Sequence, residues 1–463
     1  MYILKEICMD RTVRIAQVGF GMFGSHEVAR SVESIARDGV APFLGRIGYA
    51  CLARELADIK FEVVAVGTRS ESSAQKAADQ YEVGTGVRPK EYFGDAPWDD
   101  IIDKEKPDIL IVATPDDCHV EPIKKALENG VHVICEKPLA LKVSEVIELS
   151  ALAAEKGLLL GSDNHKEYDP DHLHIAREIL PIIGPLNYGR AYLEEPLEVS
   201  TSTFKWVADK GKAAPVHATP FSYVGIHWVS LVQNMYGRKR DGSYTMKPVQ
   251  VSGHGQKTIL RDKYGIDAVD STVVSVVYDT GATVVYENNW ITPEAFCGIV
   301  VNQGHELTGA NGKVESDQQN RGLVYWVGEN GPEGAAGKVT QRTSNSHFFR
   351  PVHALDNARL DSYAGYGMDA ITAFLAAAGR VLVKGATVAD VEGTFIDGAS
   401  QILPCAVIEA GNVSIMKNLE LSAKGLAPDA ACTIDESSGI VLKYSDENNK
   451  QAVNTIYHGP LSI

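Results

Sequence analysis

A short strand pattern that runs directly into three closely spaced glycines is the feature that most constrains how this chain folds. Residues 12–19 read TVRIAQVG, an apolar run rich in β-branched side chains, as is typical of a strand buried on both faces. Residues 19–24 read GFGMFG and open a stretch that suits a helix. In such a strand–turn–helix unit, glycines at this spacing allow a tight turn, close approach of a pyrophosphate and close helix packing. The pattern predicts a dinucleotide site at the N-terminus of that helix, with a purely structural turn as the alternative.

The strand signal recurs through the N-terminal part of the chain. Apolar runs at 61–67, 108–113, 131–136 and 157–161 alternate with helical patterns. Strands that alternate with helices form right-handed βαβ units and a doubly wound parallel sheet. We therefore expect an α/β Rossmann domain over residues 11–165.

Farther along the chain the strands become longer and alternate between apolar and polar residues. Residues 271–286 hold two such runs around an Asp-Thr-Gly turn, and Asn-Gly at 311–312 marks a second hairpin. This pattern predicts an α+β domain with an open, mostly antiparallel sheet over residues 166–415. The polar remainder, residues 416–463, is expected to be an appended C-terminal segment.

The charge balance and the cysteines exclude some classes of partner. With 44 basic and 60 acidic side chains, the formal net charge is -16, so the field of the protein repels polyphosphate backbones and anionic membrane surfaces. No apolar run approaches the roughly 18 residues of a membrane span. The seven cysteines form no C-x-x-C pair, which is typical of reduced thiols in a cytoplasmic protein. We expect neither a nucleic-acid nor a membrane partner.

The end of the second strand bears on which cofactor binds. A dinucleotide fold usually has an acidic residue there to bind the ribose 2′-hydroxyl, but this chain has Gly67-Thr68-Arg69-Ser70. Arg69 can pair with a 2′-phosphate, or it can cover the adenine face. The missing carboxylate favours NADP, with NAD as the alternative.

A lysine at the end of the fourth strand is the first candidate for chemistry. Glu136-Lys137-Pro138 ends this strand, and the carboxyl ends of parallel strands line the ligand crevice of an open α/β sheet. A primary amine beside an oxidised nicotinamide ring can have its pKa lowered, so Lys137 could exchange a proton with a substrate hydroxyl during hydride transfer. The alternative is a surface lysine paired with Glu136. The sequence leaves open whether the bond before Pro138 is cis.

The combination of these motifs resembles the Gfo/Idh/MocA oxidoreductase family, which includes glucose-fructose oxidoreductase and inositol dehydrogenase. The resemblance rests on residues 19–24, on ATPDDCH at 113–119, on residues 136–138 and on the change to an antiparallel second domain, and it spans roughly residues 11–410. It implies a nicotinamide cofactor and substrates that are mostly sugars, inositols and related alcohols. It also implies a homodimer or homotetramer that pairs the open sheets.

The resemblance assigns residues to the cofactor. The loop that matches residues 113–115 covers the cofactor, the histidine that matches His119 lies nearby, and the lysine that matches Lys137 contacts both substrate and nicotinamide. Together with the glycine loop and the end of the second strand, the predicted cofactor contacts are Gly19, Phe20, Gly21, Met22, Phe23, Gly24, Thr68, Arg69, Ala113, Thr114, Pro115, His119, Glu136 and Lys137.

A second family signature, Asp-x-Gly-x-His at the start of a helix, is altered in this chain. The matching residues are Tyr223-Val-Gly-Ile-His227, so tyrosine replaces the aspartate that assists the acid/base histidine. His227 could still exchange a proton near neutral pH, and the Tyr223 hydroxyl could donate a hydrogen bond to substrate or relay a proton. A histidine packed in the core beside Trp228 is the alternative.

The segment after the last Rossmann strand is a candidate for substrate contact. It resembles the family segment that links the domains and lines the substrate pocket, so Asn164, His165 and Lys166 are predicted to bind substrate together with Tyr223 and His227. A solvated linker is the alternative.

Two nearby segments have other interpretations. Residues 196–220 have the composition of an inserted loop that could cap the pocket. Asp169, His172 and His174 suit the start of an amphipathic helix and lack the closed ligand set of structural zinc, so no metal is assigned.

These features lead to one principal hypothesis and two alternatives. The principal hypothesis is a nicotinamide-dependent oxidoreductase acting on a secondary alcohol or ketone of a sugar or polyol, in which Lys137 and His227 handle the hydroxyl proton and Tyr223 assists. The first alternative is a glycoside-cleaving enzyme that holds NAD tightly and makes no net redox change. The second is a non-catalytic nucleotide- and sugar-binding regulatory protein, because a fold does not fix a function.

Overall fold

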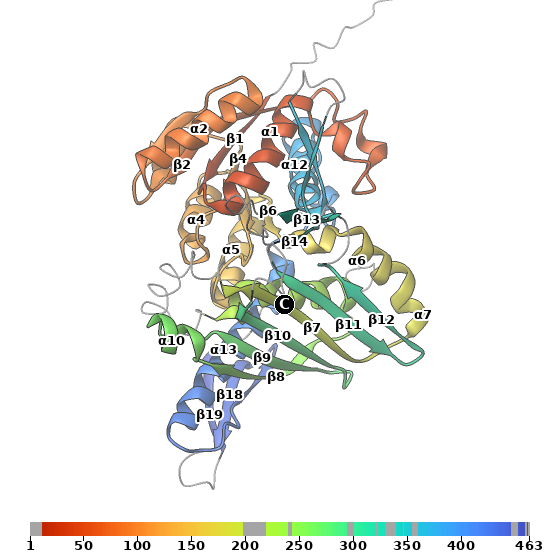
Figure 1. Ribbon diagram of the computed structural model, residues 1–463. Coiled ribbons are helices and arrows are strands. Elements are labelled where there is room, and N and C mark those ends of the chain that lie inside the picture. The colour runs from red at the N-terminus through yellow and green to blue at the C-terminus, as the bar shows by residue number, and fades with distance from the viewer. Residues whose placement is uncertain are drawn as a thin grey trace, which may run out of the picture. The chain divides into compact units, whose positions relative to one another are not determined.

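The computed structural model describes residues 12–197, 219–238, 243–293, 301–319, 323–328, 339–345, 347–353, 360–445, 452–458 and 461. The chain forms two compact units (Figure 1). The first comprises Met1–Leu139, Glu148–Tyr168 and Phe349–Gly398, and the second comprises Ala140–Ile147, Asp169–Phe348 and Ala399–Ile463. This interleaved division differs from the contiguous ranges 11–165, 166–415 and 416–463, because segments distant in sequence pack into the same core. Most of the predicted capping loop lies outside the described residues.

A six-stranded parallel sheet forms the centre of the first unit. The strand order is β3-β2-β1-β4-β5-β6, which is the order of a dinucleotide-binding fold, so the predicted Rossmann architecture is confirmed. The strands are β1 (Thr12–Val18), β2 (Lys60–Thr68), β3 (Lys90–Phe93), β4 (Ile109–Val112), β5 (His132–Glu136) and β6 (Leu160–Asp163). The apolar runs of β1, β2, β4, β5 and β6 are buried, as expected for a parallel sheet with helices packed against it, whereas the edge strand β3 is partly exposed.

Helices flank this sheet. They are α1 (Ala29–Asp38), α2 (Glu71–Thr85), α3 (Pro97–Asp100), α4 (Val120–Glu128) and α12 (Tyr366–Lys384), while α5 (Val143–Lys156) is divided between the units. Short helical turns lie at Gly24–Val28, Ala41–Phe43, Ala50–Leu52, Ile101–Glu105, Asp116–Cys118, His165–Tyr168 and Ala389–Val391. A small antiparallel pair, β15 (Arg350–Val352) and β16 (Ser362–Ala364), completes the unit.

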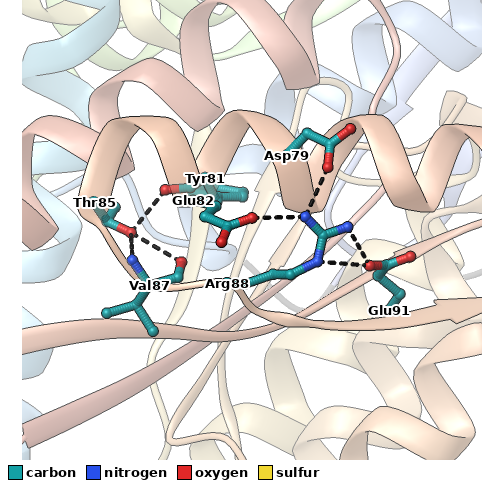
Figure 2. A network of polar contacts seen from close by, with 7 residues as sticks. All are labelled: Asp79, Tyr81, Glu82, Thr85, Val87, Arg88 and Glu91. Carbon is teal, nitrogen blue, oxygen red and sulfur yellow. Dashed lines mark hydrogen bonds and ion pairs between the residues drawn. The ribbon is translucent and has the colours of Figure 1, made fainter.

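Arg88 ties the end of α2 to β3 (Figure 2). Its guanidinium donates to Asp79 at 2.7 Å and Glu82 at 2.8 Å on the helix, and to Glu91 at 2.6 Å on the strand. All of these groups lie near the surface, where one ion pair contributes little. The network fixes a local geometry more than it adds to the free energy of unfolding.

Helix α12 comes late in the sequence but packs into the core of the first unit, against α1 (Figure 1). The Phe374 ring is so close to Gly161 of β6 that a Cβ there would come within 2.6 Å of it. Arg46, from the insertion between α1 and β2, donates to both carboxylate oxygens of Asp369, at 2.9 and 3.1 Å. Among the described helices, α12 alone is long and apolar enough to cross a membrane, but 78% of its apolar window is buried inside the structure.

A nine-stranded, mostly antiparallel sheet forms the second unit, so the predicted second-domain fold class is also confirmed. Its order is β12-β11-β7-β10-β9-β8-β17-β18-β19, with β7 and β10 parallel. The strands are β7 (Leu186–Pro196), β8 (Pro248–Gln256), β9 (Ser271–Tyr278), β10 (Thr283–Thr292), β11 (Asn302–Gly309), β12 (Gly312–Asp317), β17 (Ala431–Asp435), β18 (Gly439–Ser445) and β19 (Ala452–His458). A separate pair is formed by β13 (Leu323–Gly328) and β14 (Val339–Ser344).

Both predicted hairpins are present, because their turn residues suit the turns they form. Gly281, in the turn between β9 and β10, has φ +86°, a conformation that a glycine adopts without strain. β11 and β12 pair up to Gly309 and Gly312 across the Asn-Gly turn. Along β10 buried and half-buried residues alternate, so one face of this sheet is covered and the other is more open.

The C-terminal segment belongs to the second unit's sheet. Helix α13 (Ile402–Ala423) packs on β8 closely enough that a Cβ at Gly253 would come within 2.7 Å of Ile415. β17 then pairs with β8, and β18 and β19 extend the sheet. The polar composition of this segment did not predict these strands, because only one of their faces is covered. Among the described residues, the other helices of the unit are α6 (Pro170–His174), α7 (Leu180–Ile183), α9 (Ile226–Ser230) and α10 (Ile259–Tyr264), with short turns at Ile175–Ile179, Phe221–Gly225, Leu231–Tyr236 and Ala399–Gln401.

Candidate functional site

The three glycines after β1 have different steric surroundings. Gly19 has φ +88°, and a Cβ on it would lie 2.2 Å from the carbonyl oxygen of Ala113. A Cβ on Gly24 would lie 2.9 Å from the Gly19 oxygen. Around Gly21 nothing lies within 4 Å of a Cβ position, so the backbone there is open to a ligand. This pattern fits a dinucleotide loop, in which one glycine makes the turn, one faces the pyrophosphate and one packs the helix.

Gln17 holds this loop and was not indicated by the sequence motifs. Its side-chain amide donates to the backbone oxygens of Gly19 at 2.8 Å and Gly24 at 3.0 Å. Its Oε1 accepts a hydrogen bond from the hydroxyl of Tyr81 on α2. A glutamine within an otherwise apolar strand, directly before a glycine loop, is the signal that could have identified it.

The other loop residues divide between core and surface. Phe20 packs against the core with its ring 6.4 Å from that of Tyr81. Phe23 stacks on His165 at 6.5 Å. Met22 is 64% exposed. Only Met22 therefore presents its side chain outward from the tip of the loop.

The end of β2 presents the predicted adenosine-side residues. The Thr68 hydroxyl donates to the Ser70 carbonyl at 2.8 Å, and Ser70 accepts a hydrogen bond from the Ser73 amide as the N-cap of α2. Arg69 between them is exposed. No carboxylate occupies this strand end, in agreement with the sequence.

His119 joins two of the predicted cofactor loops. Its Nε2 lies 2.9 Å from the carbonyl oxygen of Thr114, in the loop that includes Ala113 and Pro115, and its Nδ1 lies 2.8 Å from that of Pro138. The peptide bond between Lys137 and Pro138 is cis. His119 is buried, so its ring links the ends of β4 and β5 from within the fold.

Three buried carboxyl groups interact electrostatically with the predicted catalytic lysine inside the first unit. Glu136 ends β5, and its neighbour across the sheet, in register, is Asp163 of β6. Glu27, from the helical turn after the glycine loop, completes the group. Burial raises the pKa of Glu136 to about 7 and raises those of Glu27 and Asp163 well above their ordinary values. The Lys137 side chain is close enough to lower all three pKa values.

The segment at 164–166 is buried, so the solvated-linker interpretation is wrong. Asn164 Oδ1 accepts a hydrogen bond from the Ser162 hydroxyl at 3.1 Å. The His165 ring lies between those of Phe23 and Tyr366, and burial lowers its pKa well below the ordinary value. Lys166 is also buried. These residues belong to the first unit, within reach of the glycine loop.

Tyr223 and His227 lie in the second unit. His227 is buried at the start of α9, one residue before Trp228, whose indole donates to the Tyr192 carbonyl at 2.9 Å. The Tyr223 ring makes an edge contact with Trp290 at 6.3 Å and packs on a small apolar cluster. Tyr223, at the position where the resembled signature has an aspartate, thus packs against this cluster.

Gly225, between these two residues, brings the helix against the sheet. A Cβ there would come within 2.6 Å of Phe221 and 2.8 Å of the amide oxygen of Asn288 on β10. The Asn288 amide nitrogen donates to the Leu193 carbonyl at 3.2 Å. Asn288 is thus a buried polar residue near the 223–227 signature, and the sequence motifs did not indicate it.

Potential metal ligands occur at a place that the sequence did not indicate. Donor atoms of Glu27, Asp163 and His165, all buried, lie within 4.8 Å of one another. Asp169, by contrast, caps α6, and its carboxylate accepts a hydrogen bond from Gln318 at 2.8 Å. The Gln318 amide also lies 2.8 Å from the imidazole of His172. Asp169 and His172 thus belong to a local polar network.

Comparison with known proteins supports the interpretation of the N-terminal unit. Residues 13–163 match the model of an oxidoreductase family with an NAD-binding Rossmann fold, known as GFO_IDH_MocA. D-Glucoside 3-dehydrogenase of Escherichia coli is 31% identical over 180 residues, which is 38% of this chain and 41% of that protein. 2,7-Anhydro-N-acetylneuraminate hydratase of Mediterraneibacter gnavus is 41% identical over 61 residues, 13% of this chain and 16% of that protein. The chain spans less than half the length of these curated relatives.

Solved structures match over more of the chain. Scyllo-inositol dehydrogenase from Lactobacillus casei, with bound NAD(H) and scyllo-inositol, aligns with a TM-score of 0.59 at 16% identity, covering 88% of this chain and 98% of that one. Myo-inositol 2-dehydrogenase from Lactobacillus plantarum also has a TM-score of 0.59 at 16% identity, covering 92% and 100%. At this identity the likeness establishes a shared fold for both parts of the chain.

Proposed function

We propose that this chain, whose residues 13–163 match the Gfo/Idh/MocA oxidoreductase family model, is a nicotinamide-dependent oxidoreductase that transfers hydride to or from a secondary alcohol or ketone of a sugar or polyol. The observation that best supports this proposal is the set of three glycines. Gly19 and Gly24 are sterically required, and the space around Gly21 is open. A predicted proton-exchanging lysine at the end of β5 accompanies them. The names of the sugar and inositol dehydrogenases among its relatives support the substrate class.

The cofactor would be held by the first unit. The open backbone at Gly21 suits the pyrophosphate, the exposed Arg69 suits the adenosine end, and residues 113–115 would cover the ligand. When bound, the nicotinamide supplies the hydride acceptor or donor. His119 keeps the covering loop and the lysine loop at a fixed separation.

Lys137 would handle the proton of the reacting hydroxyl. In the direction of alcohol oxidation, its amine accepts the O–H proton as the carbon loses hydride, and in the reverse direction its ammonium returns that proton. His227 is the second proposed acid/base group. Without the family aspartate, its buried ring depends on neighbours other than a carboxylate at position 223 for its orientation.

A titration with reduced cofactors tests the proposal. Purified protein is titrated with NADPH and NADH in parallel, following nicotinamide fluorescence, and is then assayed with a panel of sugars and polyols. Micromolar binding and net conversion of added cofactor support it. If neither cofactor binds and none is released on denaturation, the oxidoreductase assignment fails.

Arg69 carries the proposed preference for NADP. Replacing it with alanine should weaken NADPH binding by about tenfold or more, since a charge-assisted contact to the 2′-phosphate contributes roughly 1.5–3 kcal/mol. NADH binding should change much less. Parallel titrations of the variant measure both, and an equal loss for the two cofactors would assign Arg69 to the adenine face instead.

One relative favours a second candidate function. The name of the hydratase describes addition of water, not net oxidation, which agrees with an enzyme that holds NAD tightly and makes no net redox change. Product formed without conversion of added cofactor, together with NAD released on denaturation, would support this alternative.

We also propose a homo-oligomer that pairs the open faces of the nine-stranded sheets. The exposed Tyr188 and Val273 lie on its strands, and Arg190 pairs with Glu287 across β7 and β10 at 2.6 Å. Apolar side chains beside charges that are already paired suit a face that is covered by the same face of a second copy of the chain. Light scattering of the purified protein measures the number of subunits.

A further inference from the structure

Glu27, Glu136 and Asp163 form a buried carboxyl cluster that the proposed reaction does not yet use. They are only 2%, 8% and 1% exposed, respectively. Both oxygens of Glu27, both of Asp163 and Oε1 of Glu136 lack a hydrogen-bond partner among the described residues. Glu136 and Asp163 are also cross-strand neighbours, and the charge of Glu136 raises the pKa of Asp163 further.

The charges in this region do not balance if every acid is ionised. Three carboxylates and the Lys137 ammonium would leave two uncompensated negative charges inside the fold. Burying uncompensated charge is costly, and the usual outcome is that the groups bind protons or a metal ion. Protons on two of the three carboxyls would make the cluster and its lysine neutral overall.

The other titratable groups that face the cluster do not supply the missing positive charge. Burial lowers the pKa of His165, and the nearby Lys166 and Lys137 lower it further, so its imidazole is neutral. Burial also raises the pKa of the Cys135 thiol, with Asp116 among the neighbours that contribute. Lys166 lowers the pKa of its neighbour His165, and the positive charge that lowers the pKa values of all three carboxyls is that of Lys137.

We propose that Glu27, Glu136 and Asp163 share two protons at neutral pH and act as positioning residues that exchange a third proton with Lys137. The proton count describes the protein alone, and the exchange with Lys137 rests on the proposed function. To begin alcohol oxidation, the ammonium gives its proton to the one ionised carboxyl, which leaves a neutral amine. The amine would then take the hydroxyl proton while the O–H electron pair forms the C=O bond and the C–H pair leaves as hydride to a bound nicotinamide. The carboxyl that took the proton of the ammonium would release it to solvent before the next turnover.

A divalent cation is the competing way to neutralise the same charge. Glu27, Asp163 and His165 have the proximity that a metal site needs. The Lys137 ammonium interacts with both of these carboxyls, however, and would repel a second cation placed between them. The positive charge of Lys137 therefore favours protons over a cation.

Infrared spectroscopy of the cofactor-free protein tests the proton count without any activity. Protonated carboxyl groups have a C=O stretch distinct from the bands of carboxylates, and isotope-labelled aspartate identifies the contribution of Asp163. Because Asp163→Asn removes one acid and leaves Glu27, Glu136 and Lys137, one shared proton should remain. We expect the buried carboxylic-acid band at neutral pH to fall by about half in this variant. Asp95→Asn, at an exposed position, should leave the band unchanged.

Two results would overturn the proposal: no buried carboxylic-acid band in the wild-type protein, or stoichiometric Zn²⁺ or Mn²⁺ that is retained on dialysis and lost in Asp163→Asn. If the band behaves as expected but the protein does not turn over any substrate with NADPH or NADH, the proton-sharing cluster stands and the proposed function fails. If turnover occurs, the pH at which kcat/KM is half-maximal should shift in Asp163→Asn, which a merely structural role would not produce.

Stability should depend on pH in the direction set by the same cluster. Burial raises the pKa of Glu136 from 4.5 to about 7. A carboxyl with a higher pKa in the folded state contributes stability that is complete below its unfolded pKa and is lost as pH rises through its folded pKa. The melting temperature should therefore fall between about pH 4.5 and about pH 7, and Asp163→Asn should flatten this fall. Thermal unfolding of the wild type, Asp163→Asn and Asp95→Asn at matched pH values measures it, and parallel curves for all three would contradict the cluster's role.

Discussion

Replacing Lys137 with alanine is expected to lower kcat by about 10²- to 10⁴-fold, the usual contribution of a positioned acid/base group. The side chain is buried at the end of β5, next to the cis bond to Pro138. Removal of the amine leaves no group at that position to take the hydroxyl proton. Cofactor binding should be retained, because the glycine loop and its Gln17 contacts are unchanged. Single-turnover kinetics and fluorescence titration with NADPH and NADH separate the two effects.

The control for this experiment must account for the charge that is lost. Without the Lys137 ammonium, the three buried carboxyls need a third proton to be neutral, so the variant should also be less stable at alkaline pH. Assays near pH 6 on folded protein, with Lys156→Ala as an exposed lysine control, keep chemistry distinct from unfolding. Turnover within about threefold of wild type would remove Lys137 from the mechanism.

The sequence predicted those parts of the site whose signal is local. The Gly19–Gly24 spacing, the strand before it and the lysine at the end of β5 all follow from short patterns with a direct steric or topological meaning. The absence of a carboxylate after β2 was equally local. These are positions where a few neighbouring residues determine the backbone.

The residues that the sequence did not predict depend on contacts between distant segments. In the sequence, Glu27 is an ordinary acid near the start of a helix. Only the fold brings it close to Glu136 and Asp163, which are neighbours through the register of β5 and β6. α12 joins the first unit because Phe374 fills the space above Gly161. Asn288 and Trp290 meet the Tyr223 segment only through the folding of β10. No pattern within a single window contains these relations.

Alanine at Gly19 should have a larger effect on folding than alanine at any other position of the loop. Its φ of +88° costs a side chain roughly 1–2 kcal/mol, and the new Cβ would lie 2.2 Å from the Ala113 carbonyl oxygen, so the backbone of the covering loop would also have to move. We expect a loss of several kcal/mol in the free energy of unfolding, together with loss of cofactor binding. Thermal unfolding and fluorescence titration measure the two effects.

The Gly21→Ala variant tests ligand binding separately from folding, since nothing lies within 4 Å of the position that its Cβ would take. The melting temperature should stay at the wild-type value, as it should for Gly45→Ala, a glycine with equally open surroundings and an ordinary φ. If the pyrophosphate approaches this backbone, the added methyl occupies its space, and the affinity for NADPH and NADH should fall by about tenfold or more, equivalent to at least 1.4 kcal/mol. A stable Gly21→Ala protein with unchanged affinity would mean that the open face of the loop is not where the cofactor lies. In that case the glycines would serve the turn alone, and the dinucleotide assignment would lose its principal support.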